Sequence, residues 1–390
     1  MASPELDLLI RTRRDLHRHP EIGFEERRTA GIVAERLREA GYEVRTGVAV
    51  TGVVGTLKGG AGPGPTLIVR ADMDALPIQE ETTHDFVSTI RGRMHACGHD
   101  GHVAIGLAVA ERLARRKDQI RGAVRYVFQP AEEGLGGANK MLAEGVLDDV
   151  DAAMGLHLWL GLESGVVGVV EGPQMAGSHE FGIRISGRGG HGALPHETVD
   201  AIHAASQVVV ALQSIVSRNV SPLEPAVVSI GSFQAGSASN VIAETAELEG
   251  TIRAFDPEVL DQVRRRVREV AEGVAHSLGA NAEVRFREVS YLPTTNAPAL
   301  AQLVRDVAEE VVGVDRVRVD REVRTMAAED FSEFTARVPS VYFFVGARNE
   351  ATGAIHPHHS PRFDICEDAL PVAVDVLERA AFAYLSGRTL

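Results

Sequence analysis

The sequence predicts an α/β protein, with a mixed, mainly parallel sheet flanked by helices and a second α/β domain inserted into the first. Three observations predict this class. Short apolar runs such as Thr66 to Val69, which are typical of buried parallel strands, alternate with helical stretches. Near Glu180 the pattern changes to strands in which apolar and polar residues alternate. The length of 390 residues is also more than one simple core usually accommodates.

In the first part of the chain, helical and extended patterns follow one another. Residues 5–41 have helical spacing that is interrupted at residues 19–23 by a Pro and a Gly. The glycines and prolines between Gly59 and Pro65 predict the tip of a hairpin. The remaining elements follow from apolar periodicity: strands are expected over residues 48–57, 66–69, 123–128 and 152–158, and helices over 103–116 and 136–144.

The inserted domain is expected over residues 181–293, between the two parts of the first domain at 1–180 and 294–390. Its elements follow the order strand, helix, strand, strand, helix, strand, which is the ferredoxin-like or split βαβ arrangement. They are expected at residues 181–186, 201–216, 227–233, 246–254, 257–278 and 282–287. The first domain then resumes with a helix at 297–312, a strand at 340–345 and a last helix at 368–386.

Composition excludes several classes of protein. A formal net charge of −14 argues against a nucleic-acid partner, which would require a basic face. No apolar run approaches 18 residues, so no membrane span is expected, and no apolar core follows a basic start at the N-terminus. The two cysteines, Cys97 and Cys366, do not suggest a disulfide framework. We therefore expect a soluble, cytoplasmic protein.

The stretch from Met94 to His102 contains three histidines, a cysteine and an aspartate. Buried imidazoles and carboxylates need partners, and a divalent metal would satisfy all of these groups together. Cys97 and His99 are two residues apart, so in an extended segment their side chains point the same way. The alternative is a surface loop that is rich in histidine by chance. The density of the pattern favours a metal site on a loop between a strand and a helix.

Other polar residues follow the ends of predicted strands, where open α/β sheets place their ligands. In the pair Glu132-Glu133, one carboxylate would bind metal while its neighbour transfers protons. Asp72 would bind metal directly and Asp74 would orient a ligand, unless they cap a following turn. His157 lies in an apolar strand, where a histidine is usually a core residue, but its neighbours favour a ligand.

Two further histidine-containing segments are candidates. At least one of His356, His358 and His359 is a credible metal ligand, although spacing does not say which. The segment 187–192 is rich in glycine but lacks the Lys-Ser/Thr of a nucleotide-binding loop. Its glycines more readily explain how the backbone brings His191 close to a ligand.

These motifs resemble the zinc-dependent amidohydrolase family of aminoacylases and carboxypeptidases. Within it, the branch of hippurate hydrolases, auxin-conjugate (IAA-amino acid) hydrolases and bacterial N-acyl-amino-acid amidohydrolases is the most similar. The matching segments span nearly the whole chain in the family's order. They are residues 15–26, 70–77, 94–102, 128–133, 155–157, 187–195, 240–242, 250–253, 328–331 and 359–361.

The resemblance implies two divalent metal ions, bound by Cys97, His99, Glu133, His157 and His359, and so selects His359 from its cluster. It also implies that Glu132 is the general base and acid. Residues 181–293 are expected to form a lid and dimerisation domain, giving a homodimer or higher homo-oligomer. In that domain His191 is expected to reach the substrate, in its own or the partner subunit's site. Asn240 and Arg253 are expected to hold the polar or carboxylate end of the substrate.

The expected reaction is hydrolysis of the amide bond of a small N-acyl-L-amino acid with an acetyl, benzoyl or similar acyl group. A dipeptidase or carboxypeptidase acting on short peptides is the alternative within the family. Zinc or manganese is the favoured metal, with cobalt and nickel as further options. Two other classes are a thiol hydrolase with Cys97 as nucleophile and a binding protein whose metals are structural. The sequence departs from the family at Asp72, where other branches have His, and at His179, where an acidic residue is common.

Overall fold

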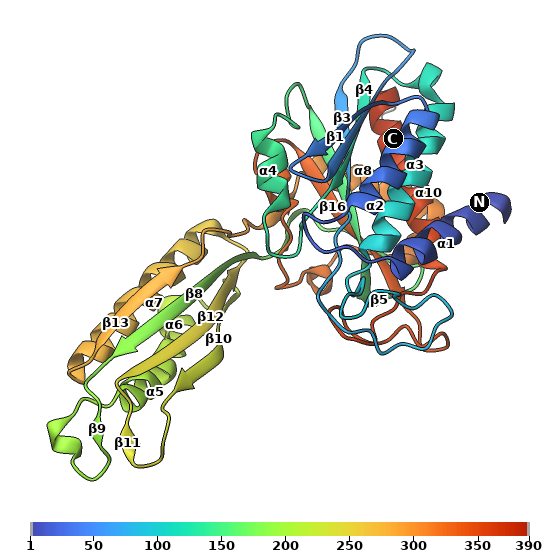
Figure 1. Cartoon of the computed structure of the whole chain (residues 1–390). Coiled ribbons are helices and arrows are strands. Elements are labelled where there is room, and N and C mark those ends of the chain that lie inside the picture. The colour runs from blue at the N-terminus through green and yellow to red at the C-terminus, as the bar shows by residue number, and fades with distance from the viewer. Residues whose placement is uncertain (1–2, 388–390) are drawn as a thin grey trace. The chain divides into compact units, whose positions relative to one another are not determined.

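The computed structural model describes residues 3–387, and these divide into two compact units (Figure 1). The first unit comprises the described residues up to Gln174, Thr294–Arg324 and the described residues from Asp330 on. The second comprises Met175–Pro293 and Thr325–Glu329. The structural boundary falls at Met175, before strand β8 (Gly177–Ser186), whereas the boundary expected at residue 181 falls inside that strand.

The first unit is built on an eight-stranded mixed sheet with the order β1-β2-β4-β3-β5-β16-β6-β15. Its central strands β4, β3, β5 and β16 are all parallel, while β1 and β2 extend one edge antiparallel. This confirms the mainly parallel, mixed sheet predicted from the apolar runs. The strands are β1 (Glu43–Val48), β2 (Gly52–Lys58), β3 (Thr66–Asp72), β4 (Ala123–Gln129), β5 (Ala152–Glu163), β6 (Val167–Gly168), β15 (Val317–Arg318) and β16 (Ser340–Arg348).

Helices cover this sheet in the order of the strands that they contact. Helix α2 packs on β1 and β2, α3 on β3 and β4, α10 on β5 and β16, and α8 on β16 and β15. Figure 1 shows α2, α3 and α10 side by side. The helices of this unit are α1 (Ser3–Arg18), α2 (Arg27–Glu39), α3 (His99–Arg115), α4 (Gly137–Ala143), α8 (Pro298–Val312), α9 (Ser332–Thr335) and α10 (Ala369–Ser386).

One local prediction for this unit was right only in part, and two were wrong. Residues 48–57 form a tight turn followed by β2, because Ala49 and Val50 both have positive φ. The segment Gly59 to Pro65 is no hairpin tip, since β2 pairs with β4 and the loop carries the chain across β4 to β3. Residues 97–99 are not extended: Gly98 has φ 93°, and His99 already begins α3.

The second unit contains a four-stranded antiparallel sheet with the order β10-β12-β8-β13, on which α5 and α7 pack. This is the split βαβ arrangement expected for residues 181–293. Two short ribbons accompany the two units: β9 (Gly190–His191) with β11 (Val241–Ile242), and β7 (Gly172–Met175) with β14 (Thr294–Asn296). The larger elements are β8, α5 (Ala201–Leu212), α6 (Ser214–Asn219), β10 (Ala226–Ala235), β12 (Thr245–Ala254), α7 (Pro257–Ser277) and β13 (Asn281–Phe286).

Local sequence explains the helices of the second unit. Asp200 caps α5 by accepting hydrogen bonds from the backbone N–H groups of Ile202 and His203. Asp256 caps α7 in the same way, and Pro257 follows at the first helical position, where its missing N–H costs nothing. Along residues 3–387, none of the helices is both long and apolar enough to cross a membrane.

Candidate metal centre

The candidate site lies where the parallel strands of the first unit end. Asp72 is the last residue of β3, Gln129 the last of β4, and His157 lies in the neighbouring β5. Because β4, β3 and β5 are parallel neighbours, their carboxyl ends meet at one edge of the sheet. The N-terminal turn of α3 adds His99 to this edge, and the loop after β4 adds Glu132 and Glu133.

The structure brings together the five residues expected to bind metal. One set with donor atoms within 4.8 Å of one another is Cys97, His99 and His157, and a second is Cys97, Glu133 and His359. The sets share Cys97, whose Sγ lies 3.5 Å from Nε2 of His157. Glu132 joins His99 and Glu133 in a further set of the same size, so it borders both. Another set at this edge is Asp72, His99 and His102.

Backbone carbonyl groups orient two of these imidazoles. His99 donates from Nδ1 to the carbonyl of Asp74 at 2.9 Å, and His157 donates from Nδ1 to the carbonyl of Leu158 at 2.8 Å. In the neutral form of either ring, this leaves Nε2 as the lone-pair nitrogen. Burial lowers the pKa of His157 well below its usual value, which keeps the ring neutral. A neutral imidazole that presents Nε2 is the form that binds a metal.

Asp72 supports the site, because both of its oxygens are already occupied. Oδ1 lies 2.6 Å from Nδ1 of His102, and Oδ2 accepts from Arg70 at 2.6 Å. His102 in turn accepts at Nε2 from the backbone N–H of Leu158 at 2.9 Å, so neither ring nitrogen is available. Arg70 also binds Asp330 at 2.8 Å. We did not predict a role for His102 or Arg70, although the spacing of His99 and His102 suits one helix face.

The histidine cluster near the C-terminus divides between two environments. Nε2 of His359 lies 3.3 Å from Oε1 of Glu133, and the backbone of His359 has φ 66°. His358 instead donates from Nε2 to the carbonyl of Leu158 at 3.1 Å, and its ring stacks on Trp159 at 4.7 Å between centroids. The structure thus places His359, and not His358, against the carboxylate cluster.

The turn that carries Glu132 and Glu133 is held on both sides. Before it, buried Ala131 has φ 56°, and its N–H donates to Oε1 of Glu26 at 2.9 Å. After it, the N–H of Glu133 donates to Oδ2 of Asp74 at 3.0 Å, which gives the expected supporting role of Asp74 a specific contact. Glu26 was part of a matched motif, but its spacing from this turn gave no signal of the contact.

The chemistry of this cluster fits a divalent metal. Nε2 of His99 is buried and has no hydrogen-bond partner. Burial, followed by the carboxylates of Glu133 and Glu132, raises the pKa of the Cys97 thiol well above its usual value. A thiol among carboxylates is a poor nucleophile, since reactive cysteines occupy electropositive surroundings. A cation would offset the carboxylates, accept the His99 nitrogen and favour the thiolate, so the donor set favours metal binding over thiol catalysis.

A second buried network fixes the start of α3 behind the cluster. The carboxylate of Asp100, next to His99, lies 2.8 Å from Nε of Arg13 and 2.8 Å from Nδ1 of His17. Arg13, His17 and Asp100 are all fully buried. The guanidinium of Arg13 and the ring of His17 hold the pKa of Asp100 well below its usual value against the effect of burial. This arrangement ties α1 to the first turn of α3 and so to the position of His99.

The other predicted site residues belong to the second unit. His191 ends β9 and is exposed, and its Nδ1 accepts from the N–H of Ala193 at 3.1 Å. Asn240 is exposed, and its carbonyl accepts from the N–H of Gly192 at 2.8 Å, so these two loops lie together. Arg253 lies in β12 and is partly buried, which lowers its pKa. Their roles remain predictions.

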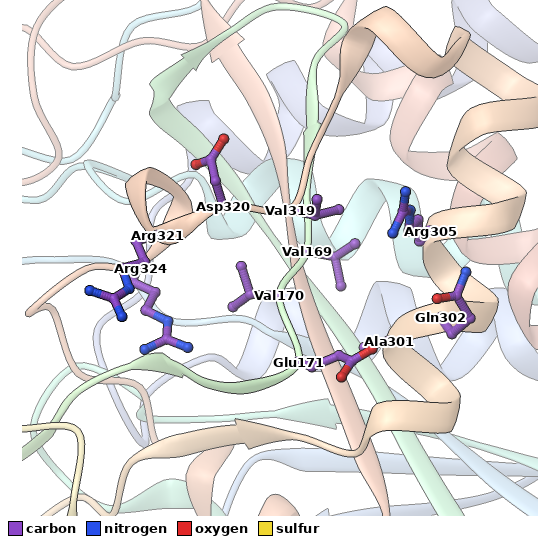
Figure 2. A pocket seen from close by; sticks show the side chains of 10 residues that line it. All are labelled: Val169, Val170, Glu171, Ala301, Gln302, Arg305, Val319, Asp320, Arg321 and Arg324. Carbon is purple, nitrogen blue, oxygen red and sulfur yellow. The ribbon is translucent and has the colours of Figure 1, made fainter.

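One cavity of the first unit, of about 430 Å³, does not contain the cluster (Figure 2). Figure 2 shows Val169, Val170 and Val319 between the side chains of α8 and those of Arg321 and Arg324. No residue that lines it belongs to a metal-type set identified in the described part of the chain.

Glu26 makes the stability of the protein depend on pH. Burial raises its pKa from 4.5 to about 7. A carboxyl group with a raised pKa in the folded state adds stability that is complete below its unfolded pKa and is lost as pH rises through the folded value. As pH rises from 4.5 to above 7, ionisation of Glu26 should therefore lower the free energy of unfolding by up to about 3 kcal/mol. The replacement Glu26→Gln cannot ionise, so the variant should gain on the wild type across this interval, as urea denaturation at pH 5, 6, 7 and 8 would show. A difference that does not change with pH would contradict this expectation.

Comparisons with known proteins agree with this geometry. Residues 68–383 match the model of Peptidase family M20/M25/M40. Thermostable carboxypeptidase 1 of Saccharolobus solfataricus is 42% identical over 93% of this chain and 92% of its own. The N-acyl-L-amino acid amidohydrolase of Geobacillus stearothermophilus is 47% identical over 74% of this chain and 78% of its own. The crystal structure of the Bacillus subtilis YXEP protein, described as a dinuclear metal binding peptidase, superposes with a TM-score of 0.83 and 36% identity, covering 98% of this chain and 99% of that one.

Proposed function

The chain belongs to Peptidase family M20/M25/M40 and is a metal-dependent hydrolase, and from this premise we propose that it cleaves the amide bond of N-acyl-L-amino acids. The observation that carries the proposal is the position of Glu132. It borders two metal-type sets that share Cys97, and it belongs to neither. A structural metal site is usually closed and leaves no carboxylate over for proton transfer.

The two sets suit two divalent ions, held by Cys97, His99, Glu133, His157 and His359, with zinc or manganese favoured and cobalt or nickel as further options. When bound, such ions supply a Lewis acid that polarises the amide carbonyl and makes a water molecule more acidic. Glu132 accepts the proton of the attacking water and delivers it to the leaving nitrogen.

The second unit is proposed to complete the site. His191 stabilises the developing oxyanion, in its own subunit or in that of a partner, and Asn240 and Arg253 hold the carboxylate of the substrate. The same unit is proposed to act as lid and as the interface of a homodimer or higher homo-oligomer. Support comes from the loops of His191 and Asn240, which are joined by the Gly192 hydrogen bond and present exposed side chains.

A second candidate is a dipeptidase or carboxypeptidase that acts on short peptides. The similarity to a protein named carboxypeptidase, over nearly the whole of both chains, favours it. The chemistry at Glu132 would be the same, because both substrates present an amide next to a free carboxylate. The two candidates differ only in the group on the acyl side of the amide, which is uncharged in one and carries an amine in the other.

A substrate panel tests both candidates. Acetyl, benzoyl and indoleacetyl conjugates of several L-amino acids are compared with dipeptides of the same C-terminal residues, using protein loaded with zinc or manganese. We expect kcat/KM to be at least about tenfold higher for the acyl conjugates, a difference of about 1.4 kcal/mol in transition-state binding. A preference for dipeptides would support the second candidate. No cleavage of any amide, with metal bound, would reject both.

A further inference from the structure

We propose that Glu26 is a positioning residue that holds Ala131 in its left-handed conformation and thereby aims Glu132 and Glu133 at the metal centre. The inference rests on the proposed function only in taking Glu132 as the base. Glu26 lies in the loop before α2, far from the cluster in sequence. It contacts neither substrate nor metal in this assignment, and it acts through the backbone of one residue.

The conformation of Ala131 needs external support. An L-residue other than glycine in the left-handed region is destabilised by roughly 1–2 kcal/mol, and Ala131 has φ 56°. Such residues persist only where their surroundings determine them, and they concentrate at functional sites. Ala131 is completely buried and directly precedes Glu132, so its φ sets the direction in which the next two side chains leave the strand.

Glu26 supplies that support through two hydrogen bonds in a closed environment. Its Oε1 accepts from the N–H of Ala131 at 2.9 Å, and its Oε2 accepts from the hydroxyl of Thr51. Glu26 has no exposed surface, and Thr51 is only 4% exposed. The Thr51 hydroxyl fixes the carboxylate on the side away from Ala131, so the acceptor cannot turn away from the strained residue.

The packing around Ala131 encloses its peptide groups. Its carbonyl accepts from the N–H of Gly137 at 3.1 Å. A Cβ at Gly137 would lie 1.7 Å from the carbonyl oxygen of Pro130, and one at Gly23 would lie 3.0 Å from the Ala131 side chain. Glycine is thus required at residue 137, and a larger residue at 23 would crowd the Ala131 side chain. Without the Glu26 carboxylate, the buried N–H of Ala131 would lose its acceptor, and the ordinary right-handed or extended conformation would be favoured.

The test is a cycle of variants built on Glu26 and Ala131. Glu26→Ala should lower kcat about 10- to 100-fold, the range seen when a supporting partner of a metal site is removed, while KM changes little. Glu26→Gln keeps an oxygen that can face Ala131 and should retain most of the activity. Ala131→Gly alone should have little effect. In the double variant, kcat should recover at least about fivefold over Glu26→Ala, because glycine adopts positive φ without steric cost.

Two controls separate positioning from loss of the fold. Glu378→Ala removes another buried carboxylate, which lies on α10 and pairs with Arg116 at 2.6 Å. This variant should have a lower Tm and an unchanged kcat. Thr51→Val removes only the outer hydrogen bond and should give a partial loss of kcat, which keeps the proposal testable if Glu26→Ala does not fold. Metal content is measured for every variant.

A crystal structure of Glu26→Ala gives a readout that does not depend on turnover. We expect φ of Ala131 to leave the left-handed region, with the carboxylate of Glu132 displaced. An unchanged φ together with an unchanged kcat would overturn the proposal, as would a loss of kcat that neither glutamine nor Ala131→Gly restores. If the wild type cleaves no amide, the proposed function fails, and φ of Ala131 in the variant still decides the role of Glu26.

Discussion

Replacement of Glu132 by glutamine is expected to lower kcat for amide hydrolysis about 1,000-fold while both metal sites remain filled. The amide keeps the size of the side chain but cannot accept a proton from water, and general acid–base catalysis contributes about 10²- to 10⁴-fold. Glu132 is buried next to Glu133 and His99, and it is not needed in either set that shares Cys97. The measurement is kcat and KM together with metal content.

The neighbouring carboxylate provides the matched comparison for this experiment. Glu133→Gln changes the same group one residue away, and it should lose metal as well as activity, because Glu133 faces His359 and Cys97. Glu132→Gln should bind substrate with an unchanged KM. If Glu132→Gln keeps wild-type turnover, Glu132 is not the base. If it loses metal to the same degree as Glu133→Gln, its role is ligation.

Removal of metal is expected to abolish activity to below about one-thousandth of the loaded rate. A Lewis acid on a carbonyl contributes several kcal/mol to the transition state, and each 1.36 kcal/mol is a factor of ten in rate. Dialysis against a chelator should reduce turnover to this level, and addition of zinc or manganese should restore it. The same chelator saturated with zinc beforehand is the control for effects other than metal removal.

This experiment also separates the metal hydrolase from a thiol hydrolase. A Cys97 nucleophile would keep its activity without metal and would lose it on alkylation. Here the raised pKa of the Cys97 thiol among carboxylates disfavours a free thiolate. His99→Ala should therefore behave as a partial metal depletion, with fewer ions bound per chain, because Nε2 of His99 is a buried nitrogen of the cluster without a hydrogen-bond partner. Activity that survives complete metal removal would contradict the proposal.

The fold was largely predictable because the central strands of the first sheet, β3, β5 and β16, contain apolar runs and the second unit has clear alternation. Predictions failed where single residues with positive φ decide the path, as at Ala49, Val50 and Gly98. The pairing of β2 with β4 also escaped prediction. Strand order depends on contacts between distant segments, and a Gly/Pro loop does not report which strand lies between its ends.

The candidate site was predictable in its chemistry but not in its supports. Cys97, His99 and Glu133 belong to dense motifs whose residue types suit few other roles. Arg70 and Glu26 act through hydrogen bonds to residues 260 and 105 positions away, so local spacing carries no trace of them. The assignment of His359 rested on family resemblance alone, and the structure adds the physical difference, since His358 is engaged by Leu158 and Trp159.

The peptide groups of Leu158 hold three imidazoles at once: the N–H binds His102, and the carbonyl accepts from His157 and His358. Every residue type except proline supplies both groups. A substitution at residue 158 can therefore weaken packing, but only proline would remove one of these backbone hydrogen bonds. The orientation of the rings thus depends on the pairing of β5 with β16, in which Leu158 lies opposite Val345. Related proteins with a different residue at position 158 are therefore expected to keep the three histidine rings in the same orientation.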